Sequence, residues 1–85
     1  MGSIAEIVQQ MIRNPYDVGF GDICRVCEYY FGDPRQTGSH IIYKTPWQGD
    51  PRINIQNDKG KAKAYQVRQV LKAIERLGIE HGIGK

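Results

Sequence analysis

The residue best suited to chemistry is His40, which follows Gly38 and Ser39 at the start of a run of β-branched and aromatic side chains. Gly-Ser is typical of a tight hairpin turn, because glycine tolerates the positive φ angles that such turns require. Histidine has an unperturbed pKa of about 6.5, so it can take or give a proton near neutral pH. In metal-free cleavage of RNA, a base helps the ribose 2′-OH attack the adjacent phosphorus, and an acid protonates the leaving 5′-oxygen. His40 can fill either role, although a lone strand histidine also occurs as a structural or simply exposed residue.

Positive charge gathers in the same part of the sequence. The chain carries a net charge of +3, but residues 33–72 sum to +5, whereas residues 1–32 sum to −2 and residues 73–85 to zero. Such a segment suits a polyanion, with RNA or DNA leading, while a solvated lysine-rich surface accounts for the same residues without a ligand. Salt-sensitive phosphate contacts are expected from basic side chains near His40, which are Arg35, Lys44, Lys59, Lys61 and Lys63. Unpaired bases can stack on aromatic groups such as Tyr43 or Trp47, although Trp47 serves equally well as a lid over the core.

Two helices are predicted to precede these residues. Ser3 and Glu6 have the spacing of a capping box, and apolar residues then recur at helical spacing from Ile4 to Ile12, until Asn14-Pro15 ends the helix. A second helix is predicted from Asp22, as its N-cap, to Phe31, with Gly32 at the C-terminal cap.

Three strands and a last helix are predicted to follow. The strands are expected over residues 35–37, 40–45 and 52–56, with a turn at Gly38-Ser39 and a loop from Pro46 to Pro51. A polar, basic linker covers residues 57–63, and apolar residues from Val67 to Leu77 mark a helix that Gly78 ends at its C′ position. The order is therefore α-α-β-β-β-α, an α+β fold in which the last five elements form a three-stranded antiparallel sheet with two helices on one face.

A chain of 85 residues allows one domain, here residues 1–85, and excludes a cofactor-binding βαβ pair or an enclosed catalytic pocket. The main core is expected over residues 22–79, with residues 1–15 as a helical extension that covers this core. A homodimer contact or contact with a protein partner are the alternatives for that helix. No apolar run is long enough to cross a bilayer, no signal-peptide pattern begins the chain, and the cytoplasm is the expected location.

Cys24 and Cys27 form a C-x-x-C pair whose other possible metal-binding partners are only His40 and His81. A structural zinc site takes four ligands, and Cys27 falls on the apolar stripe of a predicted helix. We therefore expect small buried side chains rather than a metal or redox site, and we expect His81 to lie in a frayed, glycine-rich tail.

The stretch from Ile23 to Ile79 resembles the HicA toxin family of bacterial toxin–antitoxin modules. These are small mRNA interferases whose α-β-β-β-α fold is like that of double-stranded-RNA-binding domains (dsRBDs). The resemblance covers about two thirds of the chain. Its features are the helix ending at Gly32, Gly38-Ser39-His40 running into Ile41-Ile42-Tyr43-Lys44, the strand 52–56, the basic Asp58-Lys59-Gly60-Lys61 and the helix 67–77 followed by Gly78-Ile79.

The resemblance implies a toxin that cleaves mRNA without a metal or other cofactor. The family's catalytic histidine maps onto His40, and a HicB-like antitoxin is the implied partner. We expect Gly38 and Ser39 to contact the RNA together with the five basic residues named above. The chain departs from the family where Gln56-Asn57-Asp58 replaces a Pro-x-His-like segment, which leaves Asp58 or a lysine to replace an auxiliary histidine. It also departs where Ala64-Tyr65 replaces a Gly-Thr pair.

Two other functions fit the same residues. The first is a noncatalytic RNA-binding module of dsRBD-like fold, which needs the cations but not His40. The second is a protein-interaction domain whose basic face meets an acidic partner.

Overall fold

The computed structural model describes residues 3–45 and 52–81, so the predicted loop from Pro46 to Pro51, with Trp47, lies outside the described residues. Seven elements follow one another along the chain: α1 (Ile4–Arg13), α2 (Phe20–Phe31), β1 (Arg35–Thr37), β2 (His40–Tyr43), β3 (Ile53–Asp58), β4 (Lys61–Ala62) and α3 (Ala64–His81). The fold is thus of the expected α+β kind, and its sheet has one strand more than the three predicted.

Helix α1 begins and ends where the sequence predicts. The Ser3 hydroxyl accepts a hydrogen bond from the Glu6 amide, and the Glu6 carboxylate accepts one from the Ser3 amide, which completes the capping box. Asn14 forms the C-cap before Pro15. Ile7 and Met11 are buried, whereas Ile12 is 59% exposed, so the helix has one apolar face and one solvent face.

Helix α2 begins three residues earlier than predicted. Gly19, rather than Asp22, is the N-cap, and it makes no side-chain capping bond. The first turn is fixed instead from outside the helix, because the Phe20 amide donates to the Gly60 carbonyl and Phe20 packs against the core. Asp22 lies inside the first turn, where a negative charge suits the helix dipole. Gly32 ends the helix with a φ of +88°, as predicted.

The sheet is antiparallel with the strand order β1-β2-β3-β4. Strand β1 matches its prediction, β2 ends two residues early at Tyr43, and β3 runs on to Asp58. The predicted linker 57–63 is wrong over most of its length. Lys59 and Gly60 have φ angles of +55° and +87° and form a two-residue turn, the geometry that reverses the chain into β4.

Helix α3 is longer than predicted, because it passes through Gly78 and ends at His81. Gly78 is therefore not a C′ residue, and His81 belongs to the helix rather than to a frayed tail. Glycine inside a helix costs only about 1 kcal/mol relative to alanine, which further helical hydrogen bonds and the packing of Leu77 offset.

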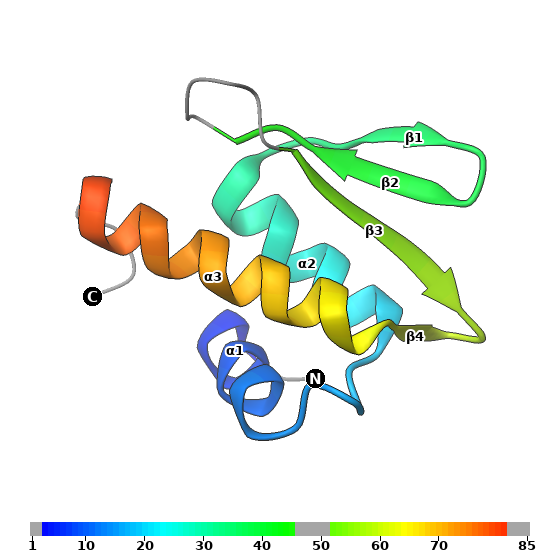
Figure 1. The fold of residues 1–85 in the computed structure, drawn as a ribbon, viewed down its shortest axis with the longest axis horizontal. Helices are drawn as coiled ribbons and strands as arrows, with labels where there is room; N and C mark the ends of the chain where they lie inside the picture. Colours follow the sequence, from blue (N-terminus) through cyan, green and yellow to red (C-terminus); the bar gives the residue numbers. More distant parts are fainter. Residues whose placement is uncertain (1–2, 46–51, 82–85) are drawn as a thin grey trace.

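The elements stack in three layers (Figure 1). Helices α2 and α3 pack against one face of the sheet, as predicted, and α1 packs on α2 and α3 on the side away from the strands. One hydrophobic cluster contains side chains from all three helices and from strands β2, β3 and β4, with α1 contributing Ile7 and Met11. The predicted role of this helix as a cover for the core therefore agrees with its packing. Within the described residues, no helix is both long and apolar enough to span a bilayer.

Candidate functional site

The candidate site lies on the face of the sheet that the helices leave open. Because side chains alternate along a strand, Ile41, Tyr43, Ile53 and Ile55 point toward the helices. The pairs between strands place the intervening residues on the opposite face, which carries no helix in the described part of the chain. These residues are Arg35, Thr37, His40, Ile42, Asn54 and Gln56.

His40 is held on this open face by Asn54. It is the first residue of β2, is half-buried, and lies opposite Gln56 of β3. Its Nδ1 lies 3.0 Å from the Oδ1 of Asn54, two residues away along β3. An amide oxygen only accepts hydrogen bonds, so Nδ1 carries a proton at this contact. In the neutral ring, Nε2 then has a free lone pair, which is the form that a general base requires.

The turn before His40 has the expected geometry. Gly38 has a φ of +60° and is the first central residue of a two-residue turn, a pattern typical of type II′ hairpins. The Gln36 side chain donates to the Gly38 carbonyl at 3.4 Å, and Thr37 pairs with His40 across the turn. Gly38 and Ser39 are exposed beside His40, so both are open to a ligand on this face.

Two of the five predicted phosphate contacts come together on the open face. Arg35 and Lys44 are exposed and line one hollow with Arg52. Arg52 was not among the predicted residues, although the alternation of Arg52, Asn54 and Gln56 with apolar residues places all three on one face. The same alternation is the signal that could have identified Asn54.

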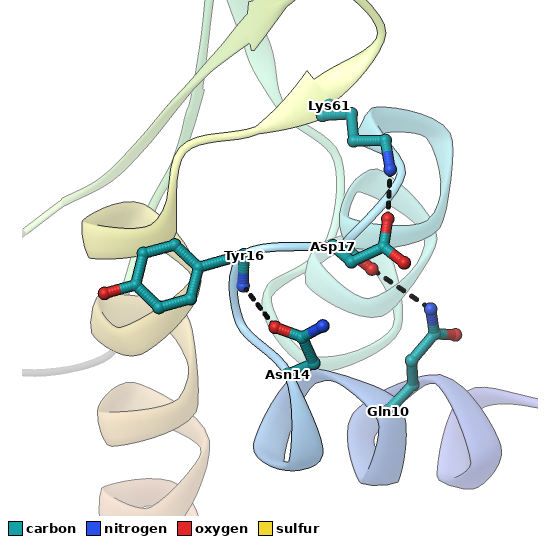
Figure 2. Close-up of polar contacts among 5 residues, drawn as sticks. All are labelled: Gln10, Asn14, Tyr16, Asp17 and Lys61. Atoms are coloured by element: carbon teal, nitrogen blue, oxygen red, sulfur yellow. Dashed lines mark hydrogen bonds and ion pairs between the residues drawn. The ribbon is translucent and has the colours of Figure 1, made fainter.

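The other three predicted contacts lie around β4. Lys59 is exposed in the β3–β4 turn, and Lys63 is half-buried directly before α3. Figure 2 shows that Lys61 forms an ion pair with Asp17, in the segment between α1 and α2. Asp17 also accepts a hydrogen bond from Gln10 through its carbonyl at 3.1 Å. Lys61 is therefore engaged in tying α1 and its following segment to the sheet.

Tyr43 cannot stack on RNA bases as predicted. Its side chain is fully buried on the helix side of the sheet, and its hydroxyl donates to the Cys24 carbonyl at 3.4 Å. Burial, followed by the nearby Cys24 and Cys27, raises the pKa of Tyr43 and keeps the phenol neutral. The candidate replacement Asp58 is exposed at the end of β3, opposite Lys61.

The two cysteines behave as small core residues. Cys27 is fully buried and Cys24 half-buried, and both are free thiols. Burial is the main cause that raises the pKa of each, so both remain protonated at neutral pH. Among residues 3–45 and 52–81, no cluster of three histidine, cysteine or acidic side chains is suited to a metal ion.

Comparison of the chain with known protein families, with curated proteins and with solved structures gave no match. The function is therefore argued from the geometry of the site.

Proposed function

We propose that this chain is a cytoplasmic toxin of the HicA type, an endoribonuclease that cleaves mRNA without a metal. The observation that carries this proposal is the position of His40, on an open sheet face that also carries exposed cations and with Nδ1 held by Asn54. An open face suits a polymer substrate, which an enclosed pocket would exclude. The order of α2, β1, β2, β3 and α3 supports the proposal, because the resemblance implies an α-β-β-β-α order, and β4 lies outside that expectation.

The proposed reaction uses the nucleophile that RNA itself provides. The ribose 2′-oxygen attacks the adjacent phosphorus while a general base takes the 2′-OH proton. The P–O bond to the leaving 5′-oxygen breaks as a general acid supplies a proton to that oxygen. The products carry a 2′,3′-cyclic phosphate and a 5′-hydroxyl. Neutral His40 can accept the first proton at Nε2, and protonated His40 can supply the second.

A HicB-like antitoxin is the proposed protein partner. It would neutralise the toxin by covering His40 and the basic residues of the open face. Because that face contributes little to the core, an antitoxin can bind it without disturbing the fold.

Expression in a bacterium tests the toxin assignment. The wild type should arrest growth and His40→Ala should not, because loss of a general acid or base typically lowers the rate by about 10²–10⁴-fold. The chain offers a matched control in His81, its only other histidine, which lies at the end of α3. His81→Ala should arrest growth like the wild type. Equal arrest by the wild type and His40→Ala would rule out the assignment.

A noncatalytic RNA-binding module is the second candidate, and the hollow lined by Arg35, Lys44 and Arg52 favours it, since these cations can bind phosphates without His40. Incubation of purified protein with RNA in the presence of EDTA separates the two functions. Histidine-dependent cutting supports the enzyme, whereas salt-sensitive binding without cutting supports the module.

A further inference from the structure

The open face has a second feature, a hollow at the end of the sheet away from the Gly38-Ser39 turn. It has a volume of about 290 Å³ and lies where β1 begins, β2 ends and β3 begins. Its lining residues are Asp33, Pro34, Arg35, Ile42, Lys44 and Arg52. Three of these side chains are cations and one is an acid, so the hollow favours an anion.

The hollow is separate from His40. Strand residues rise about 3.4 Å each, so Lys44, which directly follows β2, lies about 14 Å along the chain from His40, and Ile42 about 7 Å. A phosphate bound between Arg35, Lys44 and Arg52 is therefore not the phosphate next to which His40 would act. At a rise of about 3.4 Å per stacked nucleotide, the longer span corresponds to about four nucleotides, and to fewer when the strand is stretched.

The composition of the strands indicates what part of an RNA this face can bind. The four strands contain one aromatic side chain, Tyr43, and it is buried toward the helices. Within the described strands there is therefore no exposed tyrosine, phenylalanine or tryptophan on which a base could stack, whereas the basic side chains can bind phosphates of any sequence. The charge of the hollow and the aromatic content of the described strands both point to the sugar–phosphate backbone.

We propose that the hollow anchors a backbone phosphate of the substrate, a few nucleotides away from the bond that His40 cleaves. The inference rests on the proposed ribonuclease function and extends it. An RNA strand lies across the open face, with one phosphate between Arg35, Lys44 and Arg52 and another next to His40. The hollow contributes affinity only for substrates long enough to reach both places.

Binding tests the anchor without cleavage. A fluorescein-labelled dodecauridylate is titrated with His40→Ala, with His40→Ala/Lys44→Gln and with His40→Ala/Lys72→Gln. Lys72 is an exposed lysine of α3, in the helical layers rather than on the open face. Its substitution by glutamine changes the net charge by the same amount as Lys44→Gln. Loss of Lys44 should weaken binding on the order of tenfold at low salt and lower the salt slope by about 0.7, the value for one phosphate contact. Equal effects of the two lysine substitutions would overturn the anchor.

Cleavage tests the separation between the hollow and His40. For the wild type, kcat/KM should rise on the order of tenfold or more from a dinucleotide to a dodecanucleotide, and Lys44→Gln should remove that rise. A dinucleotide cut as fast as the dodecanucleotide would contradict the inference and leave His40 catalysis intact. A wild type that binds through Lys44 but cuts neither RNA would refute the ribonuclease and leave the anchor intact.

Discussion

At the residue scale, the site depends on how Asn54 orients His40. A histidine on an exposed strand can rotate freely, and a ring held through Nδ1 presents Nε2 in one direction. In the proposed enzyme, Asn54 would act through His40 rather than on the RNA, which would make it a positioning residue. In a catalytic triad, the third residue likewise accepts a hydrogen bond from the histidine Nδ1 and so fixes its tautomer.

Substitution of Asn54 tests this role. Asn54→Ala should lower kcat on the order of tenfold with KM unchanged, since it removes one hydrogen bond of about 1.4 kcal/mol. Asn54→Asp keeps an acceptor oxygen and should restore most of kcat. Because Asn54 is exposed, the free energy of unfolding of both variants should lie within about 0.5 kcal/mol of the wild-type value. Full kcat in Asn54→Ala, or no recovery in Asn54→Asp, would show that the contact does not position His40.

Residue type identified His40 but could not identify its partner. The Gly-Ser turn and the strand after it are local features, and both are observed. The contact with Asn54 depends on the register between β2 and β3, which is a property of the folded sheet. Tyr43 is a second example. Its residue type is compatible with base stacking, but its position in the alternation of side chains along β2 places it in the core.

At the scale of elements, α1 is an integral part of the packing. Its buried face meets α2 and α3, and its following segment is joined to β4 through Asp17 and Lys61. Arg68 of α3 adds a second link, because its guanidinium donates to the Tyr16 hydroxyl at 2.9 Å and lies over the Tyr16 ring. The helix therefore stabilises the layer that supports the sheet.

Two adjacent residues of α1 test this packing. Met11→Ala should lower the free energy of unfolding by about 2–5 kcal/mol, because Met11 is fully buried and the substitution leaves a cavity. Ile12→Ala is the matched control, and it should change stability by no more than about 0.5 kcal/mol because Ile12 is mostly exposed. Urea unfolding followed by circular dichroism measures both. Similar losses in the two variants would contradict the observed orientation of α1.

The elements that the sequence predicted correctly have strong local signals, such as the capping box of α1 and the alternation in β3. Strand β4 has none: Lys61-Ala62 becomes a strand because it pairs with Asn57-Asp58 and with the segment around Gly19. The glycine at position 60 is the sequence signal for this hairpin, because the turn requires positive φ angles at Lys59 and Gly60. The predicted end of α3 at Gly78 is wrong, because tertiary packing carries the helix past this glycine.

At the scale of the whole molecule, the hydrophobic core and the proposed site lie on opposite faces of the sheet. The helix side holds the core, including Cys27 and Tyr43, and the open side holds His40 and the hollow. Substitutions on the open face should therefore alter RNA binding and cleavage more than they alter folding. The cations of the basic middle segment lie on both sides: Arg35, Lys44 and Arg52 line the hollow of the open face, whereas Lys61 and Arg68 contact the segment between α1 and α2.

The buried thiol and phenol predict how stability depends on pH. Burial raises the pKa of Cys27 and of Tyr43 above their ordinary values of 9.0 and 10.0. Above about pH 9 the unfolded chain loses these protons while the folded chain keeps them, so the free energy of unfolding falls as pH rises. The slope should reach about 1.4 kcal/mol per pH unit for each group. Urea unfolding between pH 7 and pH 11 measures it, and Cys27→Ala should flatten the first part of the decline. Constant stability across this range would contradict the burial of both groups.

The central claim is that His40 cleaves RNA through the 2′-OH, and analysis of the cleavage products tests it most directly. Purified wild type is incubated in EDTA with an RNA oligonucleotide and with the same oligonucleotide carrying a 2′-deoxyribose at the cleaved position. The account predicts 2′,3′-cyclic phosphate and 5′-hydroxyl ends from the RNA, no cut at the deoxy position, and loss of cleavage in His40→Ala but not in His81→Ala. Cleavage at the deoxy position, products with 5′-phosphate ends, or unchanged cleavage by His40→Ala would contradict it.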